Sequence, residues 1–240
     1  LKQLEMQFNA TKQRLQNKFG TQKFIVYFQS FTNTYAPFST LKALYEKALS
    51  FDNVIGLSIG TRTDCVTDEI LDYLVDLSKD KEIWIEFGIQ SFFDETLINI
   101  NRGDTSSNMK YWINRSKEKG LNVCGHLIYG LPNETQEMML ETFRQTVELK
   151  VDSIKFHPLY VVKNTLLTNE FKKGRFTPIS EELYIDTVVK SIKILPENIS
   201  IQRITAGIND STLLSPDWCR DKHTQMKNIR LALEKEGFNY

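Results

Sequence analysis

The sequence has few cysteines, and they lie far apart. Cys65, Cys124 and Cys219 are the three cysteines among 240 residues. No pair has the close spacing of a zinc site or of a cluster-binding motif. A sparse, odd number of cysteines is typical of a reducing cytoplasm and argues against a secreted, disulfide-stapled framework. We therefore expect a cytoplasmic protein.

Long apolar runs and net charge are also missing. No segment approaches the roughly 18 consecutive apolar residues of a membrane-spanning helix, so no membrane partner is expected. Lys and Arg number 30, as do Asp and Glu, and the formal net charge is zero. A chain without net charge exerts no bulk electrostatic attraction on nucleic acid, although a local basic patch could still bind it.

The first residues have neither an initiator methionine nor the pattern of a signal peptide. Leu1–Phe19 instead has a charged helical pattern. We expect the natural N-terminus to lie upstream of Leu1.

What is present is a pattern of alternating strands and helices. A hydrophobic content of 41% and a charged content of 25% are typical of a globular protein. Ser39 and Thr67 are predicted N-caps of helices. We predict strands, each rich in Ile, Val, Phe or Tyr, at Lys23–Phe28, Val54–Ile59, Glu82–Ile89, Leu121–Ile128, Asp152–Val162 and Ile199–Ile204.

Strands that alternate with helices predict an α/β fold with a parallel sheet, either open or closed into a barrel. No internal repeat or linker divides the chain, so we predict a single domain over residues 1–240. Active sites in such folds lie at the carboxyl ends of the strands. Polar residues at those ends are therefore the candidates for function.

Two predicted strands end in polar residues. Glu86 and Gln90 share one face of their strand with Gly88, which lets a ligand approach the backbone. Buried polar groups need partners, which favours a ligand over an exposed strand face. His126 lies on the next strand, before a Gly130–Pro132 turn and a helix that could cradle a polar ligand. A satisfied core histidine and an ordinary loop are the alternatives.

Other strand ends carry charges with two readings each. Arg62 could clamp a carboxylate in a fork or simply pair with Asp64. Lys155 and His157 share a face by period two, and Arg203 lies on the last predicted strand. These three residues are either polar members of the core or face a substrate.

Several segments, taken in order, resemble the radical SAM superfamily, and within it the YhcC/YtqA-type group. The Elongator catalytic subunit and oxygen-independent coproporphyrinogen oxidase are more distant relatives. The resemblance rests on Tyr27–Tyr35, Ser58–Asp64, Phe87–Ser91, Asn99–Gly103 and His126–Thr135.

The resemblance implies a partial (β/α)6 TIM-like barrel and two cofactors, a [4Fe–4S] cluster and S-adenosyl-L-methionine. Reductive cleavage of S-adenosylmethionine at the cluster would give a 5′-deoxyadenosyl radical that abstracts hydrogen from a substrate. The substrate is unknown, with a small molecule or a transfer-RNA base as candidates. An external reductant such as flavodoxin or ferredoxin is implied as a partner.

The resemblance also implies roles for residues. It places Gln90 and Arg102 on the ribose and carboxylate of the cofactor, and His126 near the ribose, where relatives often have an acidic residue. The turn at Gly130, Leu131 and Pro132 would pack against the adenine. The remaining expected contacts are to the cofactor from Gln29 and Arg62, and to the substrate from Lys155, His157 and Arg203.

The largest departure from the family is the missing CxxxCxxC triplet. We expect the cluster cysteines and the first strand upstream of Leu1, so that this chain alone is inactive. One alternative is a degenerate, non-catalytic barrel that binds a nucleoside or a protein partner. A lyase or aldolase that uses Lys155 is a weaker one.

Overall fold

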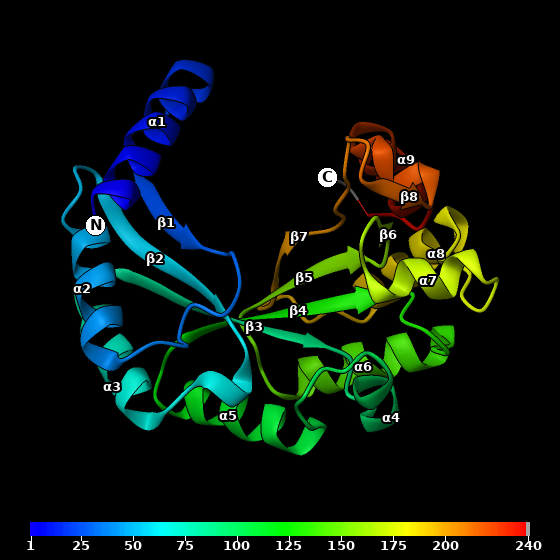
Figure 1. Cartoon of the computed structure of the whole chain (residues 1–240), viewed down its shortest axis with the longest axis horizontal. Coiled ribbons are helices and arrows are strands. Elements are labelled where there is room, and N and C mark those ends of the chain that lie inside the picture. The colour runs from blue at the N-terminus through cyan, green and yellow to red at the C-terminus, as the bar shows by residue number, and fades with distance from the viewer. Residues whose placement is uncertain (239–240) are drawn as a thin grey trace. The chain divides into compact units, whose positions relative to one another are not determined.

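The computed structural model describes residues 1–238 of the chain (Figure 1). Its helices are α1 (Lys2–Phe19), α2 (Phe38–Leu49), α3 (Asp68–Ser78), α4 (Asp94–Asn99), α5 (Ser106–Glu118), α6 (Gln136–Glu148), α7 (Leu166–Lys172), α8 (Glu181–Lys193) and α9 (Lys222–Lys235), with short 3₁₀ turns η1 (Thr63–Cys65) and η2 (Asp217–Arg220). Its strands are β1 (Phe24–Phe28), β2 (Val54–Thr61), β3 (Glu82–Gln90), β4 (Asn122–Tyr129), β5 (Ser153–Pro158), β6 (Val161–Val162), β7 (Ser200–Arg203) and β8 (Leu213–Ser215). Among residues 1–238, none of the helices combines the length and the apolar character of a membrane span.

Six of the strands form one sheet in the order β1-β2-β3-β4-β5-β7. The pairs β1–β2, β2–β3 and β5–β7 are parallel, as the alternation of strands and helices predicts. A second, small sheet joins β6 to β8 in antiparallel fashion. The predicted α/β class with a parallel sheet is therefore confirmed.

Two local predictions are wrong. The strand predicted at Asp152–Val162 is two strands, because β5 ends at Pro158 and Val161–Val162 pairs with β8 instead. Proline has no N–H for a sheet ladder, which fits a strand end there. Ser39 is not an N-cap, since α2 already begins at Phe38. Thr67 is confirmed as one: its hydroxyl accepts the Ile70 N–H at 3.3 Å.

The chain divides into two compact units, and the N-terminal unit comprises Leu1–Gly88 and Asn108–Cys124. Within it, helices α2, α3 and α5 lie over one face of β1, β2 and β3 (Figure 1). At Gly56 on β2, an added Cβ would lie 1.9 Å from the Glu82 carbonyl oxygen, so only glycine allows this close strand approach. The core side chains include Leu41, Tyr45, Leu57, Leu71, Leu74, Ile83 and Ile85.

The C-terminal unit comprises Ile89–Ser107 and the described residues from Gly125 onward. Its core is aromatic: the Phe156 ring on β5 lies 5.3 Å from that of Tyr129 and 5.8 Å from that of Phe143. The Tyr129 hydroxyl, fully buried, shares a 2.7 Å hydrogen bond with Ser191 on α8. These contacts fix the carboxyl ends of β4 and β5. The division into units does not test the single-domain assignment, which stays a prediction.

Candidate functional site

The carboxyl end of β3 is a strained turn centred on Gln90. The φ of Gln90 is 68°, and the Ser91 N–H donates to the Ile89 carbonyl at 2.9 Å across it. This is a γ-turn with positive φ at its centre, which is rare for a residue with a side chain. Strain of about 1–3 kcal/mol persists only where the surroundings enforce it, and it concentrates at functional sites.

Ser91 and Glu134 hold this turn in place. The fully buried Ser91 hydroxyl donates to Glu134 Oε1 at 2.5 Å and accepts the Phe93 N–H at 3.1 Å. Burial raises the pKa of the Glu134 carboxyl, and hydrogen bonds from Ser91 and Thr96 lower it in part. The turn after β3 is thereby tied to the turn after β4. Within the part of the chain that the structure describes, the half-buried Gln90 amide makes no hydrogen bond of its own.

The turn after β4 needs its glycine for a structural reason. Gly130 has φ 91°, and an added Cβ would lie 2.7 Å from the side chain of Ile179. Thr135 caps α6 by accepting the Met138 N–H at 3.3 Å. Leu131 is buried and Pro132 is half-buried. The turn therefore offers a small, mostly apolar surface, and its contact with a cofactor stays a prediction.

Four of the predicted residues come together on β4, β5 and β7. Burial, together with smaller contributions from Arg203 and His126, lowers the pKa of His157 to about 4. Lys155, only 8% exposed, is the register partner of Arg203 across β5 and β7. We refer to His126, Lys155, His157 and Arg203 as the strand-end cluster.

His157 is neutral near pH 7 because its pKa is low. Its Nδ1 lies 2.7 Å from the Pro158 carbonyl oxygen, so we assign the proton to Nδ1 and leave Nε2 as an acceptor. The ring also packs against Tyr160, with centroids 4.9 Å apart. His157 can therefore accept a hydrogen bond or a proton beside the positive charge of Arg203.

In the N-terminal unit, Arg62 and Asp64 pair with each other. The guanidinium donates to both carboxylate oxygens, at 2.7 and 2.6 Å, and this fork holds the pKa of Asp64 below its ordinary value. The pairing reading of Arg62 is thus the one observed. A contact from Arg62 or from the exposed Gln29 to a cofactor stays a prediction.

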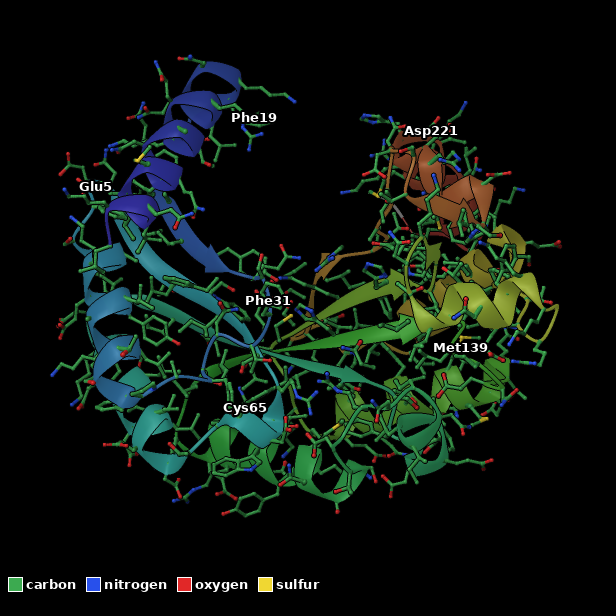
Figure 2. All side chains as sticks on the ribbon, in the orientation of Figure 1. Glu5, Phe19, Phe31, Cys65, Met139 and Asp221 are labelled. Carbon is green, nitrogen blue, oxygen red and sulfur yellow. The ribbon has the colours of Figure 1, made fainter. Side chains whose placement is uncertain are left out.

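The loop after β1 belongs to the Tyr27–Tyr35 segment on which the resemblance rests, and hydrogen bonds of Asn33 and Tyr45 hold it in place. The Asn33 amide donates to the carbonyls of Phe28 and Gly60 at 3.0 and 2.8 Å, and the Tyr45 hydroxyl donates to the Asn33 carbonyl at 2.6 Å. Phe31 lies in this loop (Figure 2); its side chain is 99% exposed and its φ is 64°. The high content of Asn, Thr and aromatics in the loop is the one signal that could reveal it.

Glu86, which the sequence favours as a ligand contact, has protein partners. It is 1% exposed, and its carboxylate accepts hydrogen bonds from the hydroxyls of Tyr27, at 2.8 Å, and Ser58. These bonds meet the need of the buried carboxylate for hydrogen-bond donors, so its burial requires no ligand.

Comparison with known proteins identifies the family. The Radical SAM superfamily profile matches residues 6–146. The chain belongs to the radical SAM superfamily. The profile of the Radical_SAM C-terminal domain matches residues 151–235. The resemblance stated from the sequence is therefore confirmed, and with it cleavage chemistry of the S-adenosylmethionine type in general terms.

Two relatives of this radical SAM chain are similar over most of their length. It is 35% identical to the uncharacterized protein YtqA of Bacillus subtilis (strain 168) over 231 residues, 96% of this chain and 72% of YtqA. It is 38% identical to the protein YhcC of Escherichia coli (strain K12) over 217 residues, 90% of this chain and 70% of YhcC.

A solved structure shows the same fold. The archaeal Elp3 of Methanocaldococcus infernus matches with a TM-score of 0.84 at 21% sequence identity, over 98% of this chain and 60% of that chain. The predicted partial (β/α)6 barrel class is thereby confirmed. This chain spans 60% of that one, and at 21% identity the likeness shows the fold alone.

The described residues do not fit the [4Fe–4S] cluster that the superfamily implies. Cys65, Cys124 and Cys219 lie on η1, β4 and η2, on separate parts of the chain. Cluster ligands are thiolates, yet burial raises the pKa of Cys65 and raises that of Cys219 to about 12. Cys65, Cys124 and Cys219 therefore do not form a cluster-binding site.

Proposed function

We propose that this chain supplies the S-adenosylmethionine-binding part of a radical SAM enzyme. The observation that carries the proposal is the strained turn at Gln90, which the hydrogen bond from Ser91 to Glu134 holds in place. Strain that a buried hydrogen bond enforces at a strand end is a mark of a prepared binding site. The Gln90 amide, free of hydrogen bonds to described residues, suits the hydroxyls of a ribose.

Neighbouring residues of the C-terminal unit fit the other parts of the cofactor. Arg102, half-buried after α4, would pair with the carboxylate because a guanidinium forms a two-bond fork with it. Leu131 and Pro132 would cover the adenine with apolar surface, and His126 would lie near the ribose. Gln29 and Arg62 of the N-terminal unit are the remaining proposed contacts.

S-adenosylmethionine bound beside a [4Fe–4S] cluster would supply the radical chemistry, which is hydrogen-atom abstraction from a substrate after reductive cleavage. The residues described above would bind and orient the cofactor, while the strand-end cluster would face the substrate. Lys155 and Arg203 would offer positive charge, and His157 an acceptor nitrogen. The substrate would be a small molecule or a transfer-RNA base, and flavodoxin or ferredoxin would be the reductant.

The test uses the complete gene product, loaded with iron and sulfide in the absence of oxygen. We would measure S-adenosylmethionine affinity and 5′-deoxyadenosine formation with dithionite. Gln90→Ala and Gln90→Gly should both weaken affinity about tenfold or more, which corresponds to a lost hydrogen bond in a site built for it. Glycine relieves the positive φ and alanine does not, so a shared loss identifies the amide as the cause.

The matched control is Gln13→Ala, on the exposed face of α1, which should leave both measurements unchanged. Arg102→Ala should weaken affinity like the Gln90 variants. Unchanged affinity and cleavage in the Gln90 and Arg102 variants would refute this assignment of the cofactor site.

A second candidate is a non-catalytic barrel that binds a nucleoside or a protein partner. The observation that favours it is that Cys65, Cys124 and Cys219 lie on separate elements of the described chain. The visible absorption spectrum of the complete gene product after iron–sulfide loading separates the two. A cluster band supports the enzyme, and no band together with retained nucleoside binding supports the non-catalytic barrel.

A further inference from the structure

A cavity in the C-terminal unit lies between the edge strand β7 and helix α9. Its volume is about 450 Å³, within the range of pockets that hold small organic ligands. No strand pairs with the outer edge of β7 in the described part of the sheet, whose order ends there. The apolar side chains along the cavity are Ile201, Ile204, Met226, Ile229 and Leu233.

The charged residues of this cavity all have one sign. Arg203 comes from β7, and Lys222 and Arg230 come from α9, with His223 beside them. No Asp or Glu lines the cavity among the described residues. Nor does any described carboxylate form an ion pair with Arg203, Lys222 or Arg230, although other arginines of the chain form such pairs.

Asp221, which precedes Lys222 in the sequence, forms its hydrogen bonds within the helix cap. It begins α9 (Figure 2), and its Oδ1 accepts the N–H groups of His223 and Thr224 at 3.0 and 3.1 Å. Its Oδ2 accepts the Thr224 hydroxyl at 2.7 Å. Both carboxylate oxygens of Asp221 accept hydrogen bonds within the cap. Asp221 therefore does not neutralise the positive charges of the cavity.

We propose that this β7–α9 cavity binds an organic phosphate, with the phosphate on Arg203, Lys222 and Arg230 and an apolar body on the floor. Three cations without a carboxylate match a group that carries up to two negative charges. Arginine offers a planar fork to phosphate oxygens, and lysine offers a point charge. Ile201, Ile229 and Leu233 form an apolar floor. An organic phosphate can cover this surface with its apolar part, whereas an inorganic phosphate ion cannot.

The phosphate group could belong to either of two ligands, a free nucleotide or the backbone of a nucleic acid. The inference deepens the proposed function, because Arg203 also belongs to the strand-end cluster proposed to face the substrate. Its test contains no S-adenosylmethionine and no cluster. Failure of the phosphate site and failure of the radical chemistry are therefore separate results.

The experiment measures binding to the full chain by calorimetry at two salt concentrations. The probes are adenosine 5′-monophosphate, adenosine, and a single-stranded five-nucleotide oligoadenylate. The test variant is Lys222→Gln with Arg230→Gln. The matched control, Lys227→Gln with Lys235→Gln, removes two charges from the same helix but from residues outside the cavity.

We expect the monophosphate or the oligonucleotide to bind at least tenfold more tightly than adenosine. The test variant should lose tenfold or more of that affinity, with a shallower salt dependence because fewer phosphate contacts remain. The control should change affinity less than twofold. The four substituted residues, Lys222, Lys227, Arg230 and Lys235, are all solvent-exposed, and thermal melting of each variant checks that it is folded.

The two sources give distinct supporting results. Tight binding of the monophosphate alone identifies a free nucleotide as the ligand, whereas binding that requires the oligonucleotide identifies nucleic acid. Equal affinity for adenosine and its monophosphate would overturn the proposal. So would equal losses in the test and control variants, since these would reflect diffuse charge rather than this cavity.

Discussion

The strand ends of the two units differ in how their charges are compensated. In the N-terminal unit, Arg62 and Asp64 follow β2 and close a two-bond ion pair with each other. In the C-terminal unit, Arg203 ends β7 beside His157 and has no ion pair with a described carboxylate. A charged residue at the end of a parallel strand is thus not by itself a ligand contact. The useful sign is charge that the protein leaves uncompensated.

The largest change in the free energy of unfolding is expected from substitutions at the turn glycines of the two units, Gly130 and Gly120. Gly130→Ala places a Cβ 2.7 Å from Ile179 at a φ of 91°, whereas at Gly120, with a φ of 83°, nothing lies within 4 Å of an added Cβ. We expect Gly130→Ala to cost about 3 kcal/mol, from overpacking and strain together. Gly120→Ala should cost about 1 kcal/mol from strain alone. Urea unfolding measures both, and equal losses would remove packing as the reason for Gly130.

The lock on the Gln90 turn comes next in expected size. Ser91→Ala removes the hydrogen bond to the buried Glu134 carboxylate and should lower the free energy of unfolding by about 2 kcal/mol. Ser78→Ala, which removes an exposed hydroxyl at the end of α3, should cost less than about 0.5 kcal/mol. Similar effects of the two variants would mean that Ser91 does not hold the turn.

The same variant should change the pH dependence of stability. The pKa of Glu134 lies above its ordinary value of 4.5, so the folded state holds this proton more tightly than the unfolded chain. Its contribution to stability is present at low pH and is lost as pH rises through the raised pKa. Ser91→Ala should move this loss to higher pH, because the bond from Ser91 lowers the pKa.

A titration of His157 tests the charge of the strand-end cluster. Its pKa of about 4 lies below the ordinary 6.5, so its contribution to stability is present above pH 6.5 and is lost as pH falls toward 4. Nuclear magnetic resonance of the imidazole should show a midpoint near 4. Arg203→Gln should raise it by removing a nearby positive charge, and Lys227→Gln on α9 should not. An unchanged midpoint in Arg203→Gln would separate Arg203 from the cluster.

The smallest effect is expected at the compensated strand end. Asp64→Asn breaks the fork to Arg62, but both side chains are about one-third exposed, so the cost should be about 0.5 kcal/mol. The pKa of Asp64 lies below its ordinary 3.8, and the stability that it contributes is lost as pH falls below that value. A loss above about 2 kcal/mol in denaturant unfolding would show that the pair is more than a surface contact.

Much of the fold was predictable from local pattern. The strands from Phe24 to Tyr129 were found within two residues at each end, because buried β strands are rich in branched and aromatic residues. Thr67 was found because an N-cap bonds within three residues of itself. Leu213–Ser215 was missed and Val161–Val162 was merged with β5, since strands of two or three residues carry no periodic signal.

The sequence by itself determined the family, the alternation of strands and helices, and the residues that stand at strand ends. Each of these depends on neighbours in the chain or on motifs in fixed order. The tertiary structure alone decided that Ser91 locks onto Glu134, that Ile179 requires a glycine at position 130, and that Lys222 and Arg230 join Arg203 around one cavity. These residues lie tens of positions apart, and a contact at that separation is set by how the elements pack, which no local spacing encodes.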